Sequence, residues 1–206
     1  MLLEALAENY RNHGRKPWVI PVGASDGHGV WGYFNCAREL KADFGRESIA
    51  PQKLFHATGS AGTQAGLSAG AVAYELPCEI IGMAVCDNEN YFLNKVREDL
   101  THWADYYKTG MKVVDIPVTV NDRYIGPGYA VATEEVLDVI RQVAATEGIV
   151  LDPVYTGKAF FGMINEIKNG ALNDCSDVVF VHTGGIFGLM AQADKLGFTR
   201  PGNQAN

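Results

Sequence analysis

The sequence has 206 residues, enough for one sizeable domain with a buried core. Apolar residues make up 47% of it and the formal net charge is -7, which excludes a disordered chain and a basic nucleic-acid-binding surface. The N-terminal stretch MLLEALAENYRNHGRK has helical spacing instead of the basic start and apolar run of a secretory signal, and no later run is long enough to cross a membrane. We therefore expect a cytoplasmic protein with no nucleic-acid or membrane partner.

Short, continuously apolar runs alternate along the chain with segments of helical periodicity. The runs cover residues 18–22, 54–57, 80–85, 113–118 and 178–182. Continuous hydrophobicity is typical of strands buried on both faces. Between these runs, residues 134–143 and 160–167 carry apolar side chains at helical spacing. This order predicts an α/β fold, a mostly parallel twisted sheet with helices on both faces.

The first predicted strand leads into a polar loop, VGASDGHGVWGY, in which Ser25, Asp26 and His28 lie among glycines. Such a loop can face a ligand. A Ser-His-Asp hydrolase is a weaker interpretation, because the sequence has no G-x-S-x-G elbow and neighbours in sequence do not by themselves form a triad. The cysteines and histidines are too dispersed to predict a metal site.

The passage LFHATGSAGTQAGLSAGAVAYE predicts a strand, a small-residue turn and then an alanine-rich helix. The turn consists of Thr58, Gly59, Ser60, Ala61, Gly62 and Thr63. Glycines allow the backbone N–H groups to surround an anion, and the start of the helix adds its positive dipole end. The turn matches neither G-x-x-x-x-G-K-[ST] nor G-x-G-x-x-G, so a nucleotide is disfavoured. We expect a phosphate site here; a turn that serves packing alone stays open.

Three later segments place polar side chains beside glycine or proline residues, which interrupt regular secondary structure. VVFVHTGGIFGLMA repeats the strand–turn–helix order and presents Thr183 at a strand end, where ligands collect in open parallel sheets. Gly126-Pro127-Gly128-Tyr129 and Asp152-Pro153-Val154-Tyr155 each set a tyrosine on a rigid loop. A phenol can bind a substrate carboxylate or move a proton, although a tyrosine more often serves packing.

Five blocks in this order resemble the pyridoxal-phosphate family of D-cysteine desulfhydrase and 1-aminocyclopropane-1-carboxylate deaminase, in the fold type II group related to the tryptophan synthase β subunit. The blocks are PWVIPVGASDGHGVWGYFNCAREL, ATGSAGTQAG, GPGYA, DPVYTGKAFFGMI and VFVHTGG. The resemblance covers nearly the whole chain. It implies that the cofactor is pyridoxal 5'-phosphate and that the substrate is a small amino acid.

The resemblance also implies roles for individual residues. The turn at 58–63 would hold the cofactor phosphate, and Thr183 would bond the pyridine nitrogen. A neutral hydroxyl at that nitrogen makes the ring a tempered electron sink, which suits β-elimination. Tyr129 and Tyr155 match the catalytic tyrosines that also bind the substrate. The other implied substrate-binding residues are Ser25, Asp26 and Thr156.

The family's Schiff-base lysine and the asparagine beside the cofactor ring belong to an N-terminal region that has no counterpart in this sequence. Without that lysine, we expect the chain to be inactive alone. The resemblance implies that residues 1–44 finish the small domain and that residues 45–206 form the large, cofactor-binding domain. A sheet with uncovered edges predicts association, and we expect a homodimer.

Three functions follow as hypotheses. The leading one is a lyase that eliminates sulfide, or another β-leaving group, from D-cysteine or a related amino acid to give pyruvate and ammonia. The second is a noncatalytic descendant that binds phosphate or a partner. The third is 1-aminocyclopropane-1-carboxylate deaminase; the family's deaminases resemble this chain but carry glutamate after the second tyrosine, where this chain has Thr156, which favours the desulfhydrase.

Overall fold

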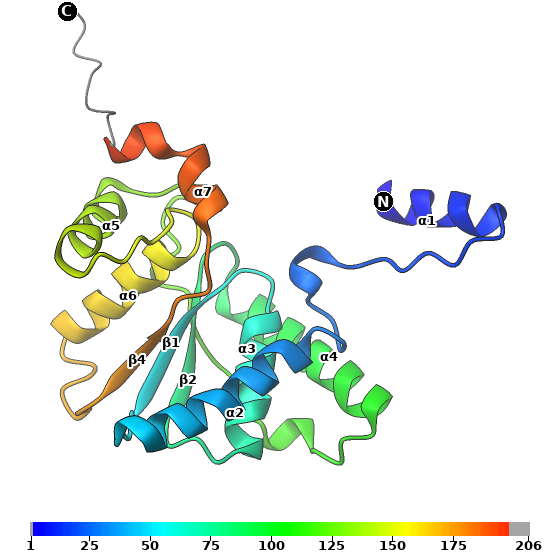
Figure 1. Cartoon of the computed structure of the whole chain (residues 1–206), viewed down its shortest axis with the longest axis horizontal. Helices are drawn as coiled ribbons and strands as arrows, with labels where there is room; N and C mark the ends of the chain where they lie inside the picture. The colour runs from blue at the N-terminus through cyan, green and yellow to red at the C-terminus, as the bar shows by residue number, and fades with distance from the viewer. Residues whose placement is uncertain (1, 198–206) are drawn as a thin grey trace, which may run out of the picture.

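A four-stranded parallel sheet forms the centre of the computed structural model, which describes residues 2–197 (Figure 1). The strands are β1 (Lys53–Thr58), β2 (Glu79–Ala84), β3 (Thr119–Asn121) and β4 (Val178–Val181). Their order across the sheet is β3-β2-β1-β4, and each neighbouring pair is parallel. The loops that follow β1 and β4 therefore lie next to each other at one edge, where open α/β sheets bind ligands.

Helices cover both faces of this sheet, as the sequence predicts. Figure 1 shows α2, α3 and α4 on one side and α5 and α6 on the other, with α7 at the end of the body. The helices are α1 (Leu2–Asn12), α2 (Val30–Glu47), α3 (Gly62–Ala73), α4 (Glu89–Tyr107), α5 (Glu134–Glu147), α6 (Thr156–Lys168) and α7 (Ile186–Ala191). The α/β class with a parallel sheet is thus confirmed.

The continuous apolar character of β1 follows from burial on both of its faces. Phe55 and Ala57 pack in one apolar cluster with Met163 of α6. Leu54 points the other way and packs with Phe44 of α2. Successive side chains of a strand alternate between faces, so a strand covered on both sides is buried along its length, and the polar His56 and Thr58 of β1 are buried with it.

Two predicted strands are wrong. Residues 18–22 form no strand, and Trp18 and Ile20 are 68% and 64% exposed. A strand needs a hydrogen-bonded neighbour. This apolar segment is flanked by Pro17 and Pro21, which have no N–H to donate to one. Residues 113–118 contain a short 3-10 helix at Val113–Asp115, and β3 begins only after Pro117, which has no N–H to donate to a sheet.

Helix α1 and the chain that follows it extend away from the sheet as an arm (Figure 1). Leu2 and Val22, near the two ends of this arm, are both 85% exposed. The expected domain division after residue 44 falls within α2, which continues to Glu47; that division and the homodimer stay predictions. Within residues 2–197, no helix combines the length and the apolar character that crossing a membrane requires.

Candidate active site

A cavity of about 430 Å³ lies at the carboxyl ends of β1 and β4 and brings together residues from distant parts of the sequence. Six of the predicted site residues line it, namely Gly59, Ser60, Thr63, Tyr129, Tyr155 and Thr183. The rest of its lining is Val22, Gly23, Tyr33, Ala57, Gly184 and Gly185. A larger and more open hollow of about 850 Å³ along α4 contains none of the predicted residues. We therefore take the sheet-edge cavity as the candidate site.

The turn at residues 58–63 has the geometry of an anion cradle. Ala61 has a φ of 79°, a left-handed conformation that turns the chain sharply from β1 into α3. Thr63 and Gln64 lie in the first turn of α3, where backbone N–H groups have no partner within the helix. These donors, together with the helix dipole, favour a negatively charged group at this end of the cavity.

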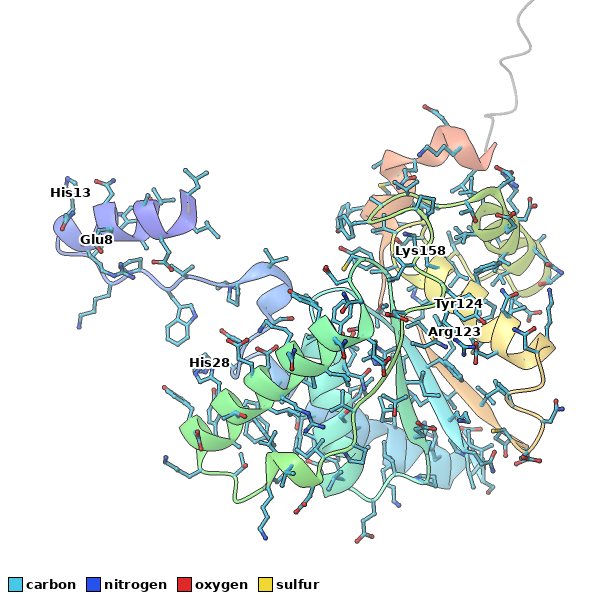
Figure 2. All side chains as sticks on the ribbon, turned by 180° about the vertical axis from the view of Figure 1, so that it is seen from behind. Glu8, His13, His28, Arg123, Tyr124 and Lys158 are labelled. Carbon is cyan, nitrogen blue, oxygen red and sulfur yellow. The ribbon has the colours of Figure 1, made fainter. Side chains whose placement is uncertain are left out.

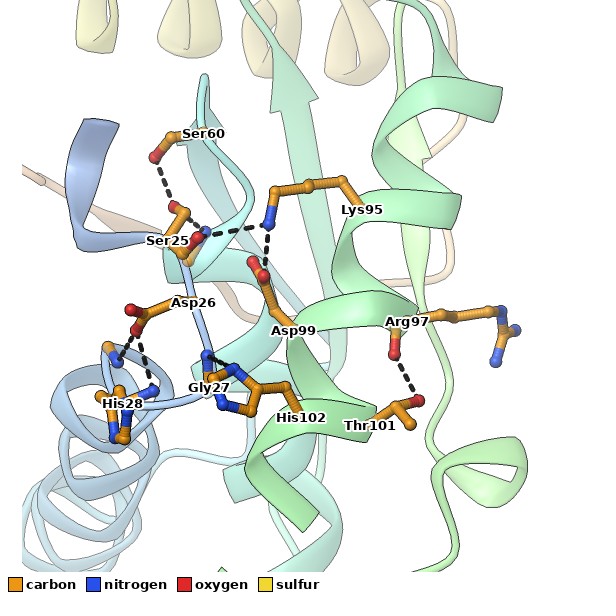
Figure 3. A network of polar contacts seen from close by, with 12 residues as sticks. Ser25, Asp26, Gly27, His28, Ser60, Lys95, Arg97, Asp99, Thr101 and His102 are labelled. Atoms are coloured by element: carbon orange, nitrogen blue, oxygen red, sulfur yellow. Dashed lines mark hydrogen bonds and ion pairs between the residues drawn. The ribbon is translucent and has the colours of Figure 1, made fainter. Parts of the chain in front are cut away.

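Ser25 joins the cradle from a different part of the chain. Its hydroxyl donates to Ser60 Oγ at 2.8 Å and accepts the N–H of Gly62 at 2.9 Å (Figure 3). A Cβ on Gly62 would lie 2.8 Å from Ser25 Oγ, so only glycine permits this approach. We call residues 58–63 together with Ser25 the cradle wall of the cavity.

Asp26 does not share this position. Its carboxylate accepts the N–H groups of His28 at 2.8 Å and of Gly29 at 2.9 Å, and it thereby orders the turn that leads into α2 (Figure 3). The structure therefore brings Ser25 into contact with the cradle turn, whereas Asp26 bonds elsewhere, and neither residue lines the cavity itself. Contact between Asp26 and a substrate stays a prediction.

Tyr129 and Tyr155 lie beside each other on the cavity lining and form what we call the tyrosine wall. Their hydroxyl groups are hydrogen-bonded to each other. Burial raises the pKa of Tyr155 well above its ordinary range, and the hydrogen bond between Tyr155 and Tyr129 adds to the effect. Tyr155 therefore keeps its proton at neutral pH, so it can donate a hydrogen bond to a ligand.

Asp152 fixes the position of Tyr155. Its carboxylate, 1% exposed, accepts the N–H groups of Val154 at 2.7 Å, Tyr155 at 2.9 Å and Thr156 at 2.7 Å. The Thr156 hydroxyl also donates to Asp152, and that threonine is fully buried. Thr156 is therefore bonded to Asp152 and does not line the cavity. A substrate-binding role for Thr156 stays a prediction.

Lys158 fixes the loop that carries Tyr129. This lysine is 1% exposed and lies near the start of α6 (Figure 2). Its ammonium group donates to the carbonyl oxygens of Val85 at 3.4 Å, Ile125 at 2.9 Å and Gly128 at 2.5 Å. Burial lowers the pKa of Lys158, while these contacts give the ammonium group carbonyl partners.

The turn after β4 completes the cavity beside the two walls. Thr183 is partly exposed and lines the cavity. Next to it, Gly184 donates its N–H to His182 Nδ1 at 3.1 Å, and His182 Nε2 lies 3.0 Å from the carbonyl oxygen of Val150. Gly185 has a φ of 111°, and a Cβ there would lie 2.2 Å from Asp152 Oδ1, so this glycine allows the turn to pack against the tyrosine wall.

Three important residues lay outside the sequence predictions, each for a physical reason. Asp152 precedes a helix in the order Asp-Pro-x-x-Thr, a capping pattern from which its role could have been inferred. Lys158 has charge and helical position as its only local signals, and neither indicates burial. Tyr33 reaches the cavity from α2, a helix for which no element was predicted.

The fold and this site define a parallel α/β protein with a cavity at the carboxyl ends of its strands, and the comparisons name its family. Residues 2–184 match the family model described as pyridoxal-phosphate dependent enzyme. A putative 1-aminocyclopropane-1-carboxylate deaminase of Thermotoga maritima is 43% identical over 184 residues, covering 89% of this chain and 56% of that protein. The chain therefore belongs to the pyridoxal-phosphate-dependent enzyme family.

Other relatives carry both activity names. The bifunctional D-cysteine desulfhydrase/1-aminocyclopropane-1-carboxylate deaminase of Arabidopsis thaliana is 37% identical over 95% of this chain and 48% of its own length. A D-cysteine desulfhydrase of Serratia proteamaculans is 35% identical over 92% of this chain and 56% of its own. The crystal structure of an ACC deaminase homologue superposes with a TM-score of 0.84 at 35% identity, over 94% of this chain and 57% of that one. The chain thus spans about half the length of the relatives it matches.

The residues at the cavity fit the cofactor of this family. Backbone N–H groups, hydroxyls and a helix dipole can bind a phosphate, and the cradle wall offers all three; no lysine or arginine lines the cavity among the described residues. Thr58, at the start of the cradle turn, is 1% exposed and is not among the residues that line the cavity.

Proposed function

We propose that this chain forms the cofactor-phosphate and tyrosine walls of a lyase of the D-cysteine desulfhydrase type. Pyridoxal phosphate, when bound, supplies an electron sink for chemistry at the Cα of an amino acid. The proposed reaction converts D-cysteine and one water into pyruvate, ammonia and sulfide. The observation that supports it most is the meeting of the cradle, both tyrosines and Thr183 around one cavity.

Each wall has a defined task in this proposal. The cradle turn at 58–63 binds the phosphate through backbone N–H groups and the hydroxyls of Ser60 and Thr63. Thr183 meets the pyridine nitrogen with a neutral hydroxyl. Tyr155, which keeps its proton, donates to the substrate carboxylate or to a group that gains negative charge, and Tyr129 holds its phenol in place.

Two alternatives remain, and each has its own supporting observation. No lysine lies among the described residues that line the cavity, which favours a noncatalytic phosphate-binding or partner-binding role for the chain by itself. Relatives named as deaminases of 1-aminocyclopropane-1-carboxylate favour that substrate. Thr156 favours the desulfhydrase, because its hydroxyl is bonded to Asp152 and is not available to the acid-base chemistry of ring opening.

Two samples separate these functions. The first is the chain alone with pyridoxal phosphate, which we expect to bind the cofactor without releasing pyruvate from D-cysteine. The second joins the chain to the part of the Thermotoga maritima relative outside the matched region, which makes up just under half of that relative. We expect this chimera to release pyruvate and sulfide from D-cysteine faster than it releases ammonia from 1-aminocyclopropane-1-carboxylate.

Each other outcome contradicts a stated part of the proposal. A folded chain that does not bind pyridoxal phosphate removes the cofactor site. A folded chimera that binds the cofactor but turns over neither substrate supports the noncatalytic role. Faster deamination than desulfhydration assigns the cyclopropane substrate instead.

A further inference from the structure

One face of α4 is hydrogen-bonded to the loop that carries Ser25. Lys95, Asp99 and His102 stand at i, i+4 and i+7, so they lie on the same side of the helix. Lys95 Nζ donates to the carbonyl oxygen of Ser25 at 3.2 Å and to the carboxylate of Asp99 (Figure 3). His102 Nδ1 accepts the N–H of Gly27 at 3.1 Å. The backbone on both sides of Asp26 is therefore fixed from α4.

The ion pair between Lys95 and Asp99 is not well explained by a contribution to stability alone. The Asp99 side chain is only 3% exposed, and its Oδ2 has no hydrogen-bond partner among the described residues. Burial raises the pKa of Asp99, and Lys95 opposes that shift. A buried carboxylate with an unsatisfied oxygen is costly, and buried ion pairs are weak sources of net stability. The pair is better explained by the geometry that it imposes on Ser25.

We propose that Lys95, held by Asp99, is a positioning residue of the cradle. By fixing the carbonyl of Ser25, it keeps the Ser25 hydroxyl between Ser60 Oγ and the N–H of Gly62. Lys95 does not line the cavity, so it acts through Ser25 and not by touching the phosphate. This inference rests on the proposed cofactor site for its ligand, but the contact with Gly62 can be measured without any ligand.

A rival explanation is that the positive charge of Lys95 attracts the phosphate through space. The two explanations predict opposite effects for Asp99→Ala. If charge acts through space, removal of the carboxylate unmasks Lys95 and tightens binding of pyridoxal phosphate. If Lys95 positions the loop, the same change releases its ammonium group from its anchor and weakens binding by about threefold, the scale of a modest hydrogen bond.

The test measures the dissociation constants of pyridoxal phosphate and of inorganic phosphate for the wild type, Lys95→Met, Asp99→Ala, Ser25→Ala and the double variant Ser25→Ala/Lys95→Met. Lys95→Met should weaken binding about tenfold, but it should have little further effect once Ser25→Ala is present. Lys168→Met, an exposed change on α6, is the control and should leave binding unchanged. Fully additive effects of Ser25 and Lys95, or tighter binding by Asp99→Ala, would overturn the proposal.

A second readout is hydrogen exchange of the Gly62 amide, whose N–H donates to Ser25 Oγ. Lys95→Met and Asp99→Ala should speed its exchange about tenfold relative to amides in the middle of α3, whereas Lys95→Arg should largely restore protection. Unchanged Gly62 exchange in folded Lys95→Met rejects the positioning role. If the wild type binds no pyridoxal phosphate, the proposed function fails, yet the exchange result still decides the role of Lys95.

Discussion

The cradle wall and the tyrosine wall face the same cavity, but they are held by different kinds of contact. In the cradle wall, Ser25 and Ser60 meet through neutral hydroxyl groups, and the nearest ion pair lies behind them on α4. The loops that carry the tyrosine wall are held by Asp152 and Lys158, two buried charged side chains that bind backbone groups directly. In the cradle wall the charged pair contacts only the carbonyl of Ser25, whereas Asp152 and Lys158 contact the loops of both tyrosines.

The difference follows from what each wall is able to do. A phosphate brings its own negative charge, so backbone N–H groups and hydroxyls suffice to receive it. The phenols of Tyr129 and Tyr155 are carried on loops, and a loop needs buried partners to hold a side chain at one place. We therefore expect changes in the tyrosine wall to cost mainly folding stability and changes in the cradle wall to cost mainly ligand affinity.

The largest expected effect is that of Asp152→Asn. The amide replaces one acceptor oxygen with a donor that faces the N–H groups of residues 154–156, so we expect the free energy of unfolding to fall by about 3 kcal/mol. Chemical denaturation measures this loss, and the exposed change Asp174→Asn is the matched control. A loss below about 1 kcal/mol would show that Asp152 does not anchor the tyrosine wall.

A somewhat smaller loss is expected for Lys158→Met. Methionine fills a similar volume but leaves the carbonyl groups of Val85, Ile125 and Gly128 without their shared donor, which should cost about 2 kcal/mol of unfolding free energy. Denaturation monitored by tyrosine fluorescence measures the change. Affinity for inorganic phosphate should change little. If the phosphate affinity of Lys158→Met falls while its free energy of unfolding is unchanged, the expected difference between the two walls is contradicted.

The smallest expected effect is a pH dependence of folding stability that arises from His56 in β1, the strand that leads into the cradle turn. His56 is fully buried in β1, with its ring between the carbonyl oxygens of Ala57 and of the Gln64 side chain on α3. Burial lowers the pKa of His56, so the unfolded chain takes up the proton first. Stability is therefore fully present above about pH 6.5, the ordinary histidine value, and declines as the pH falls below it.

Thermal unfolding at a series of pH values checks this pH dependence. His56→Gln cannot titrate, so its unfolding temperature should depend less on pH between neutrality and mild acid. The exposed change His13→Gln is the control and should keep the wild-type slope. If His56→Gln shows the same acid sensitivity as the wild type, the buried histidine is not its source.

The sequence predicts the cavity well where its walls are local patterns. Small residues after an apolar run indicate a strand-to-helix turn, and parallel pairing of β1 with β4 then brings Thr183 beside the cradle. Contacts between distant segments leave no comparable pattern. Ser25 and Lys95 are 70 positions apart, and nothing in their neighbourhoods indicates that one fixes the other.

An apolar run also predicts a strand wrongly where no neighbouring strand is present to pair with it. The segment around Trp18 and Ile20 is as apolar as a strand, yet it lies in the exposed arm because no neighbouring strand accepts its hydrogen bonds. The opposite error affects α2, in which Val30, Phe34 and Ala37 are buried at helical spacing but are interrupted by small and polar residues. Periodicity identifies an element only when its apolar stripe is dense.

The central claim is that the turn at residues 58–63 receives the phosphate of pyridoxal phosphate. Its most direct test is calorimetric titration of the cofactor into the wild type and into Ser60→Ala/Thr63→Val, with the exposed pair Ser176→Ala/Thr146→Val as control. We predict affinity about 100-fold weaker for the cradle variant, the effect of two hydroxyl contacts to a charged group, with an unchanged unfolding temperature. Equal affinity in the wild type and the folded cradle variant would contradict the account.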